Sequence, residues 1–390
     1  MPDAKITGAP EPGRTGRRAE SSAEAEKRFA LDRQRTDRVI RVVTPFVSVV
    51  IAVLIGSLLV LASGKDPVAA FSALWQGAFG SQRAIGETLL RSTPLILTGF
   101  ALAYGFRAGL FNIGAEGQLF LGGLAAAFVG IKVGSLPWAI AVPTILIAAA
   151  LAGAAWAFIP ALMKARIGAN EVITTMMFSY IGKYLVSYFV QGPLSDKSGI
   201  PQTAQLPANS MLPRLNTVLP FLQPTRAHLG FVLAIALAVV VWAALKYTTL
   251  GFEARAVGYN LFASQSGGIS VSSTIIKSLC ISGALAGLAG AVEVMGTFGR
   301  LFDSFSNGLG FTGIAVALLA KNNPIAVIPA ALLFGALQAG AGTMQLVANV
   351  PSQLVDVLQA IIILLVAAET IVPWALERAR KRKAVAPVAG

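Results

Sequence analysis

The chain has 390 residues, of which 55% are hydrophobic and 13% charged, and its mean hydropathy is +0.70. Soluble domains carry about 25% charged residues, so this composition excludes an ordinary soluble protein and indicates a polytopic membrane protein. The single cysteine, Cys280, and the single histidine, His228, exclude an internal disulfide, a cysteine-based metal site and a histidine cluster. The net charge of +13 does not indicate nucleic acid as a partner, because the basic residues are placed as membrane topology requires.

Residues 1–41 form a polar segment that mixes basic and acidic side chains before any apolar run begins. The segment is too long for an ordinary signal peptide. Its first part is rich in glycine and proline and is expected to be disordered, whereas residues 21–41 are rich in Ala, Glu and Arg and predict a helix on the membrane surface. A solvated surface is the simpler interpretation of this tail, and a binding function is the alternative.

Apolar runs long enough to cross a hydrocarbon core, which takes roughly 20 helical residues, then follow one another. The predicted spans lie near 43–63, 87–106, 110–131, 137–163, 171–190, 228–246, 271–297, 308–320, 325–346 and 353–376. The eighth is short and rich in glycine, which predicts a half-helix or a re-entrant segment. We therefore expect an all-α fold with about ten transmembrane helices, including the short or re-entrant one, in a membrane domain at 42–376.

Lys and Arg residues predict the orientation, because cytoplasmic loops carry more of them. With the N-terminus in the cytoplasm, an even number of crossings returns the C-terminus and its basic tail, 377–390, to the same side. The cytoplasmic basic residues then outnumber the external ones by about threefold. The external ones are Lys65, Arg83, Lys132, Lys197, Arg214, Arg226 and Arg300. Both termini are therefore expected in the cytoplasm, with anionic membrane lipids rather than nucleic acid as the counterpart of the positive charge.

Residues 107–118 hold a polar stretch inside otherwise apolar sequence. Two amides, Asn112 and Gln118, and one carboxylate, Glu116, stand among three glycines. Such side chains at membrane depth are costly unless they face a cavity or a partner, so the stretch is a candidate site. The alternative is a short cytoplasmic turn in which Asn112 caps the next helix and Glu116 lies in its first turn. The two interpretations are compatible, because transporters place sites at broken helix ends.

Two connections are too long to be simple turns. The outer one, 192–227, contains six prolines and is expected to be ordered by them more than by secondary structure. It is either a cover and docking surface for an external protein or a passive linker. The inner one, 247–269, contains two short helix-like segments, 251–257 and 260–266, and Asn260 is placed to cap the second.

The inner connection also carries apolar side chains that we expect to be exposed. Such residues in a cytoplasmic loop favour association unless a partner buries them, so they predict a partner protein. They are Leu250, Phe252, Val257, Leu261 and Phe262.

Three segments, Gly109–Gln118, Gly168–Met177 and Gly251–Gly268, resemble the permease subunits of ATP-binding cassette importers. The branch is the one that includes branched-chain amino acid, ribose and nucleoside permeases, and the first segment is similar to the nucleoside or purine-type members, which include simple sugar permeases. The resemblance extends over about residues 43–376, whereas the polar residues 1–41 depart from the family core.

The resemblance implies a type II-like importer permease that works with partner proteins. These are a second permease subunit, expected to be a related chain in a heterodimer, two cytoplasmic ATPase subunits and an extracytoplasmic solute-binding lipoprotein. This sequence has no Gly-x-x-x-x-Gly-Lys-Ser/Thr loop for ATP phosphates. We therefore expect no enzyme activity and no cofactor in this chain, with ATP and Mg used by the partner ATPase. The residues that match the family's ATPase-coupling helix are Leu250, Gly251, Phe252, Glu253, Arg255, Ala256, Gly258, Asn260 and Leu261.

A nucleoside is neutral, with a flat base and a hydroxylated ribose, so its path needs aromatic faces and hydrogen-bonding groups rather than a fixed counter-ion. The path candidates of these kinds are Asn112, Glu116, Gln118, Asn170, Glu171, Tyr180, Glu293 and Gln338. Structural roles are the alternatives. Glu171 is placed to cap a helix start, Glu293 to pair with Lys277, and Gln338 to bridge helices.

Other functions remain as alternatives. A ribose- or galactose-type sugar is the alternative solute for an importer. A secondary transporter would act without an ATPase and would not need exposed apolar residues in a long cytoplasmic loop. A membrane enzyme would show paired acidic residues for a divalent metal, and the sequence has no such pair.

Overall fold

The computed structural model describes residues 47–217 and 225–366. Within these ranges the regular structure is helical, and β pairing is limited to isolated bridges, which confirms the predicted all-α fold. The predicted surface helix at 21–41 and the basic tail at 377–390 lie outside the described residues. Of the predicted spans, the first is described from Val47 and the last as far as Val366.

The helices follow one another with short connections except at the outer and inner connections. In chain order they are Val47–Ala62, α2 (Pro67–Phe79), α3 (Gln82–Arg107), α4 (Ala115–Lys132), α5 (Trp138–Ile167), α6 (Glu171–Gln191), η1 (Ala208–Ser210), η2 (Leu215–Thr217), α7 (Gly230–Tyr247), α8 (Thr249–Tyr259), α9 (Leu261–Ser266), α10 (Val271–Val292), the π-helix η4 (Glu293–Phe298), α11 (Leu309–Leu319), α12 (Pro324–Ala348) and Gln353–Val366. Five of the described helices, α3, α5, α7, α10 with η4, and α12, are long and apolar enough to cross a membrane.

Two local features differ from the prediction. Helix α2 was not predicted, because its 13 residues are too few to cross a membrane; Asp66 starts it by accepting a hydrogen bond from the Val68 N–H at 2.9 Å. The predicted span at 110–131 begins later, at Ala115, because the chain leaves the helix after α3 and turns at Gly109, where φ is +71°.

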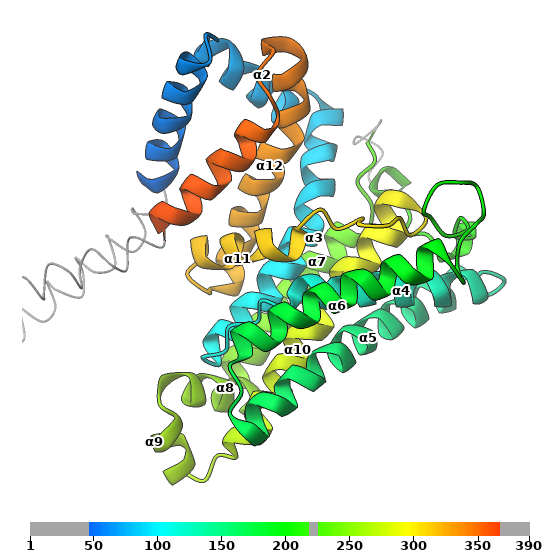
Figure 1. Cartoon of the computed structure of the whole chain (residues 1–390), viewed down its shortest axis with the longest axis vertical. Coiled ribbons are helices and arrows are strands. Elements are labelled where there is room, and N and C mark those ends of the chain that lie inside the picture. The colour runs from blue at the N-terminus through cyan, green and yellow to red at the C-terminus, as the bar shows by residue number, and fades with distance from the viewer. Residues whose placement is uncertain (1–46, 218–224, 367–390) are drawn as a thin grey trace, which may run out of the picture.

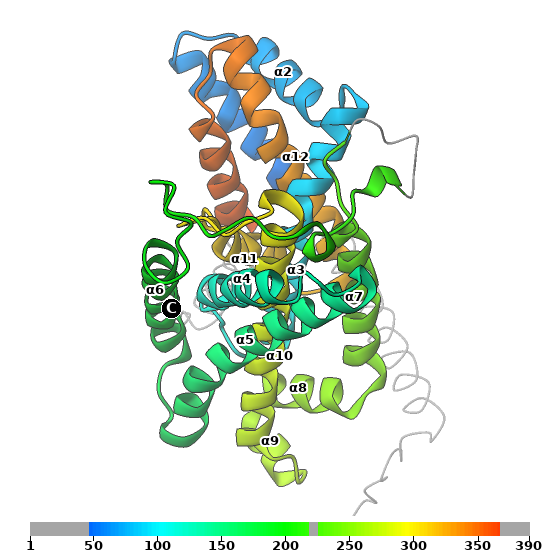
Figure 2. The ribbon, with the colours of Figure 1, turned by 90° about the vertical axis from the view of Figure 1, so that its right-hand side faces the viewer.

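Helix α10 lies at the centre of one half of the molecule, against α4 and α5, while α12 packs against α2 and α3 in the other half (Figures 1 and 2). Helix α3 joins the halves by packing against both α10 and α12. The close approach of α10 depends on glycine: a Cβ on Gly122 of α4 would collide with the Gly287 backbone of α10. Small residues are the usual means of such packing in membranes, where lipid removes most of the hydrophobic driving force.

The outer connection is hydrogen-bonded to the chain segment that follows α10. Its backbone N–H groups at Thr203, Leu206 and Leu212 donate to carbonyl oxygens of residues 295–301 at 2.8–3.1 Å. Leu206 and Leu212 are buried, so this part of the connection belongs to the core rather than forming a loose linker. Apart from η1 and η2, its described residues hold no helix, as the proline content predicted.

An acidic turn marks the surface of this connection. Two hydrogen bonds from Ser198, one from the hydroxyl and one from the backbone N–H, hold the pKa of the partly buried Asp196 carboxyl below its usual range. Arg300 lies 3.7 Å from the same carboxylate and links the connection to the chain after η4. The turn therefore keeps its negative charge on the face opposite α8 and α9.

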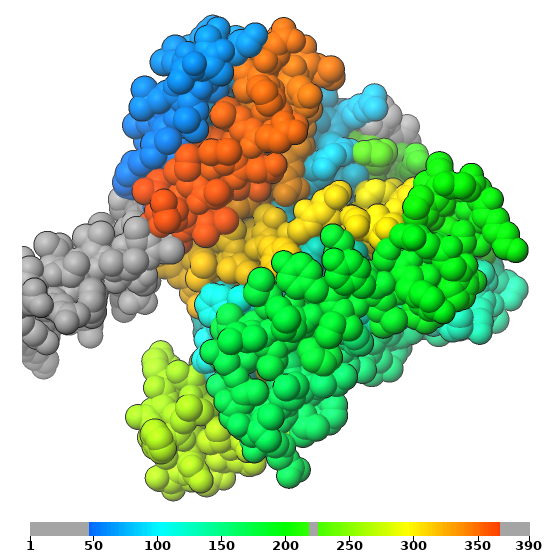
Figure 3. Space-filling model, viewed as in Figure 1, coloured from blue at the N-terminus to red at the C-terminus, as the bar shows by residue number. Residues whose placement is uncertain are grey.

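Helices α8 and α9 lie at the other end of the bundle and stand out from it at the lower left of the space-filling view (Figure 3). Thr248 caps α8 by accepting from the Gly251 N–H at 3.2 Å. Asn260 caps α9 by accepting from the Ala263 N–H at 3.0 Å, which confirms its predicted role.

Candidate functional site

The chain between α10 and α12 is an interrupted helix, with an irregular segment between two helical parts. After the π-helix η4, residues 299–308 run without α-helix, and α11 then supplies only 11 residues, which confirms the predicted half-helix. A helix this short cannot span the hydrocarbon core, so its first turn starts inside the protein, where its N–H groups have no helical partner.

Glu116 of α4 meets this internal helix end. Its Oε2 accepts a hydrogen bond from the Gly310 N–H at 2.7 Å, and the side chain is only 6% exposed. A second N–H at the start of α11, that of Leu309, donates a hydrogen bond to the Ser306 hydroxyl oxygen at 3.2 Å. A carboxylate at a helix N-terminus also interacts favourably with the helix dipole. In this structure Glu116 therefore holds the start of α11, which is 194 residues away in sequence.

Asn112 and Gln118 form a buried amide pair beside it. The Asn112 Nδ2 donates to Gln118 Oε1 at 2.9 Å, and the Gln118 Nε2 donates back to Asn112 Oδ1 at 3.1 Å. The Asn112 Nδ2 also donates to the Ser282 hydroxyl at 2.8 Å, and that hydroxyl donates to the Ala101 carbonyl at 2.6 Å. Both amides are almost fully buried, so this network joins α3, α4 and α10.

The predicted cap at the start of α4 is wrong in detail. The N-cap residue is Gly114, with no side-chain cap. Asn112 Oδ1 accepts instead from the Gly114 N–H at 3.1 Å, because the chain turns before the helix begins. Glu116 does lie in the first turn of α4, as predicted.

The remaining path candidates lie at separate places. Asn170 caps α6 by accepting from the Val172 N–H at 3.0 Å, and the first helical residue, Glu171, pairs with Lys164 at 2.8 Å. The cap at this helix start is thus Asn170 rather than Glu171. In the structure both residues stabilise the turn between α5 and α6.

Glu293 is buried at the start of η4, where the helix widens to a π-helix. The predicted ion pair with Lys277 is not formed, because the two residues lie far apart along the continuous helix formed by α10 and η4, at about 1.5 Å per residue. Lys277 lies 4.0 Å from Glu253 of α8 instead. Gln338 is half-buried on α12 and makes no hydrogen bond with the described residues, so it does not bridge helices there. These side chains and the amide pair do not form one continuous cluster.

Helix α6 has an exposed face with aromatic and charged side chains. Tyr180, Tyr184 and Tyr188 follow one another at a spacing of four residues and are 46%, 69% and 65% exposed. Lys183 is exposed between them, whereas Thr175, Ser179, Gly182, Val186 and Val190 are buried on the inner face. Only Tyr180 was identified from the sequence. The spacing of the other two tyrosines was the available signal, but their exposure depends on how α6 packs at the edge of the bundle (Figure 2).

The composition of this face favours protein or water over lipid as its surroundings. Lys183 lies near the middle of the 21-residue helix. Helix α6 is the predicted span at 171–190, but it is not among the five described helices that are long and apolar enough to cross a membrane. A charged side chain at the centre of a spanning helix costs about 2.5–3.5 kcal/mol when it faces hydrocarbon. The α6 face, defined by Tyr180, Lys183, Tyr184 and Tyr188, is therefore suited to contact a polar solute or another subunit.

Helix α8 has a buried face and an exposed one. Ala254 and Val257 are buried against the bundle, so the prediction that Val257 is exposed is wrong: it shares the inner face with Gly251 and Ala254. Phe252 is 59% exposed and Phe262 of α9 is 82% exposed. Leu250 and Leu261 are also exposed, as predicted.

Helix α8 touches the turn between α3 and α4 through backbone atoms. A Cβ on Gly109 would lie 3.1 Å from the Cα of Gly258, and a Cβ on Gly258 would collide with the Arg107 carbonyl oxygen. The two chain segments therefore meet with no side chain between them. The same turn leads directly into Asn112 and Glu116, so α8 is joined structurally to the buried polar network.

Comparison with known proteins places these features in a family. The sequence model described as "Branched-chain amino acid transport system / permease component" matches residues 84–367. The guanosine ABC transporter permease protein NupP of Bacillus subtilis (strain 168) is 41% identical, over 89% of this chain and 99% of the relative. The glucose ABC transporter permease protein TsgB13 of Haloferax volcanii is 37% identical, over 82% and 86%.

The nucleoside ABC transporter permease protein NupB of Lactococcus lactis subsp. cremoris (strain MG1363) is 36% identical, over 88% of this chain and 95% of the relative. No solved structure matches the chain. The resemblance seen in the sequence is thus confirmed over most of its length. The chain is a multi-pass membrane protein that belongs to the branched-chain amino acid transport system permease family, as a permease component of an ABC transporter.

Proposed function

We propose that this chain is the permease subunit of an importer for nucleosides, with purine nucleosides such as guanosine as the first candidates. The observation that carries the proposal is the likeness to NupP, at 41% identity over 99% of that relative, together with NupB. The glucose permease TsgB13, at 37% identity, supports a simple sugar as the second candidate solute. Ribose is common to both chemistries, since it is part of a nucleoside and is itself a sugar.

The α6 face is the proposed lining of the solute path, at a contact with a second permease subunit. Tyrosine rings offer flat apolar surfaces to a base, and their hydroxyls and the Lys183 ammonium offer hydrogen bonds to base and ribose. Helix α6 packs mainly against α4 and α5, which leaves its outer face for a partner. A related chain in that position would complete the path as a heterodimer.

Asn112, Glu116 and Gln118 lie inside the bundle, behind the α6 face. They are buried and bonded to other groups of this chain, so their proposed role is to hold the half-helix α11 and the turn after α3 in place. Their polar groups hydrogen-bond the backbone where the helix is interrupted. Transport depends on them because they set the position of α11.

Helices α8 and α9 are the proposed contact with a cytoplasmic ATPase. Their exposed apolar side chains are of the kind that a groove on a partner protein buries. The sequence has no phosphate-binding loop of its own, so the ATPase is a separate protein. ATP and Mg then belong to the ATPase. The outer connection, at the opposite end, is the proposed docking surface for a solute-binding lipoprotein.

In this proposal both termini, α8 and α9 lie in the cytoplasm, and the support is the roughly threefold excess of basic residues that the sequence assigns to that side. Gln265 of α9 is exposed and suits a labelling test in a chain whose Cys280 has been replaced. Reaction of Gln265→Cys with an impermeant maleimide in intact cells would contradict the orientation.

Uptake measurements test the proposed solute. Cells that express the complete importer should accumulate labelled guanosine, and cells that lack this chain should not. Unlabelled nucleosides should compete, whereas glucose and ribose in the same concentration range should not. Competition by glucose or ribose without competition by nucleosides would assign the importer to sugars instead.

Replacement of Lys183 tests the α6 face. If the ammonium faces the path or a subunit contact, Lys183→Leu should lower uptake roughly tenfold, which corresponds to about 1.4 kcal/mol, while the complex still assembles. The matched control is Lys132→Leu, an exposed lysine at the end of the neighbouring helix α4. Unchanged uptake together with raised thermal stability of Lys183→Leu would show that this face meets lipid.

Replacement of Glu116 separates a structural role from a direct one. Glu116→Ala leaves the Gly310 N–H without its acceptor, which costs about 1–3 kcal/mol, so the variant should show a lower melting temperature and lower uptake together. Glu116→Gln keeps an acceptor oxygen and should stay close to the parent in both. A Glu116→Ala protein of unchanged stability that fails to transport would place the carboxylate on the path.

Replacement of Phe252 tests the ATPase contact. Burial of one such side chain is worth about 1.5–3 kcal/mol. Phe252→Asp should therefore weaken ATPase binding about tenfold to a hundredfold, with loss of solute-stimulated ATP hydrolysis and normal membrane insertion. Phe252→Leu keeps an apolar side chain and is the control. Normal uptake by a well-expressed Phe252→Asp protein would argue against the coupling role and favour a secondary transporter.

A further inference from the structure

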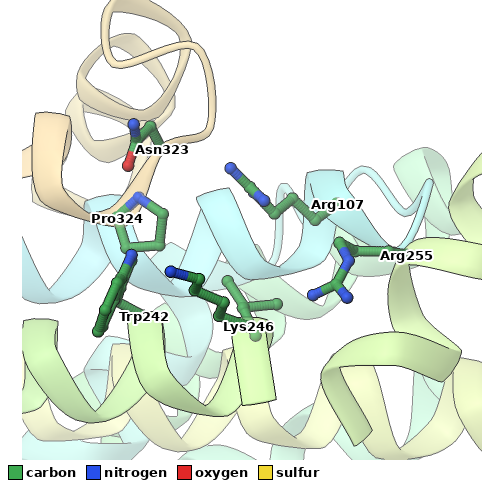
Figure 4. Close-up of a pocket in the computed structure, with 7 residues that line it drawn as sticks. Arg107, Trp242, Lys246, Arg255, Asn323 and Pro324 are labelled. Atoms are coloured by element: carbon green, nitrogen blue, oxygen red, sulfur yellow. The ribbon is translucent and has the colours of Figure 1, made fainter. Parts of the chain in front are cut away.

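A pocket lies where the ends of α3, α7 and α12 meet α8 (Figure 4). Its volume is about 280 Å³, far more than a single water needs. The residues that define it are Arg107 from α3, Trp242 and Lys246 from α7, Arg255 from α8, and Asn323 and Pro324 at the start of α12. None of these residues belongs to the α6 face or to the Asn112–Gln118 network.

Three cations line the pocket, and no described acidic side chain pairs with any of them. The nearest acid in sequence, Glu253, is directed to Lys277. Arg107 is held in place because its Nε donates to the Asn322 carbonyl at 2.7 Å. Lys246 lies over the Trp242 ring, with Nζ 4.9 Å from the ring centroid. Cations gathered without a counter-ion repel one another, and an anion in the pocket would remove that cost.

Helix dipoles account for only two of these cations. Arg107 and Lys246 lie in the last turns of α3 and α7, where a positive charge is favourable. Arg255 lies in the middle of α8, where that reason does not apply, and it still lines the same pocket. The convergence of one cation from α8 with two from the bundle is therefore the feature that needs a ligand.

The surroundings of the pocket favour a lipid as that ligand. Val239 lies one turn before Trp242 on the same side of α7 and is 59% exposed, and Ile325, next to Pro324, is 55% exposed. Exposed apolar side chains thus border the pocket on both helices, at the places where acyl chains would lie. Tryptophan beside a basic residue at a helix end is typical of the level of the headgroups.

We propose that this pocket binds the phosphate of an anionic glycerophospholipid, with its acyl chains along α7 and α12. One phosphate group there contacts Arg255 of α8 together with Arg107 and Lys246 of the bundle. The lipid therefore links the coupling helix to the membrane domain. This inference does not depend on which solute the importer carries.

The test uses the complete importer in nanodiscs and in detergent. Phosphatidylglycerol should be retained through purification and raise the melting temperature, whereas phosphatidylcholine should not. Arg255→Gln and Lys246→Gln, made separately, should each weaken phosphatidylglycerol binding about fivefold, as expected for the loss of one cation near the surface. The matched control is Arg166→Gln, an exposed arginine in the last turn of α5 outside the pocket, and it should bind as the parent does.

Four results would overturn the proposal. The first is equal retention of the two lipids, and the second is an equal loss of phosphatidylglycerol in Arg166→Gln, which would indicate bulk charge. In the third, inorganic phosphate added to the detergent-purified importer protects it as well as phosphatidylglycerol does, so the ligand is a soluble phosphate. In the fourth, Arg255→Glu keeps phosphatidylglycerol and loses the ATPase, so an acidic side chain of the ATPase occupies the pocket.

Discussion

The fold depends on one requirement, that every backbone N–H and C=O inside the bilayer finds a partner within the protein. A continuous helix is the simplest way to meet this requirement, but the chain between α10 and α12 is not a continuous helix. Its free backbone groups therefore need hydrogen-bond partners from other segments. Its first part receives hydrogen bonds from the outer connection, where Thr203 and Leu206 donate to Leu301 and Gly299. Its second part receives the carboxylate of Glu116. The outer connection and α4 thus bond to the same irregular segment, at its two ends.

Close packing makes those partners available. Helix α10 can lie at the centre because glycines let its backbone approach α4 and α5. The same packing brings Ser282 of α10 to Asn112, so an amide that is costly in lipid is fully bonded in the assembled bundle. Polar residues inside this membrane domain therefore stabilise contacts between helices, and the polar groups left on the surface, on α6 and around the basic pocket, are the ones available to other molecules.

Much of the fold followed from run length and charge alone. Spans such as those of α5 and α10 are long apolar runs, and the short α11 was indicated by its glycines and the Asn-Asn-Pro that follows. Helix α2 was not predicted because it is too short to be recognised as a membrane span. Asp66 followed by Pro67 was nevertheless a pattern typical of a helix start. The exposure predicted for Val257 was wrong because Val257 follows Gly251 and Ala254 at three-residue steps and shares the buried side of α8 with them.

Side-chain partners were predictable only where they are local. Asn260 caps a helix that begins at the next residue, and this cap was predicted from the sequence. Asn170 caps α6 in the same way, one residue before Glu171, the position predicted for the cap. Glu116 and Asn112 could be recognised as polar groups at membrane depth, but their partners, Gly310 and Ser282, are 194 and 170 residues away. No local pattern connects such positions. For the same reason the three cations of the basic pocket, which come from three helices, could not be grouped before the structure was known.

The contact between Gly109 and Gly258 has a mechanical consequence. Side chains can change rotamer and absorb a displacement of about an ångström, but two backbones in direct contact cannot. A shift of α8 toward the bundle is therefore passed undiminished to the turn after α3. That turn leads within a few residues to the side chains that bond α10 and the start of α11. The stiffness of the route from the surface to the broken helix is thus set by the two residues that have no side chain at all.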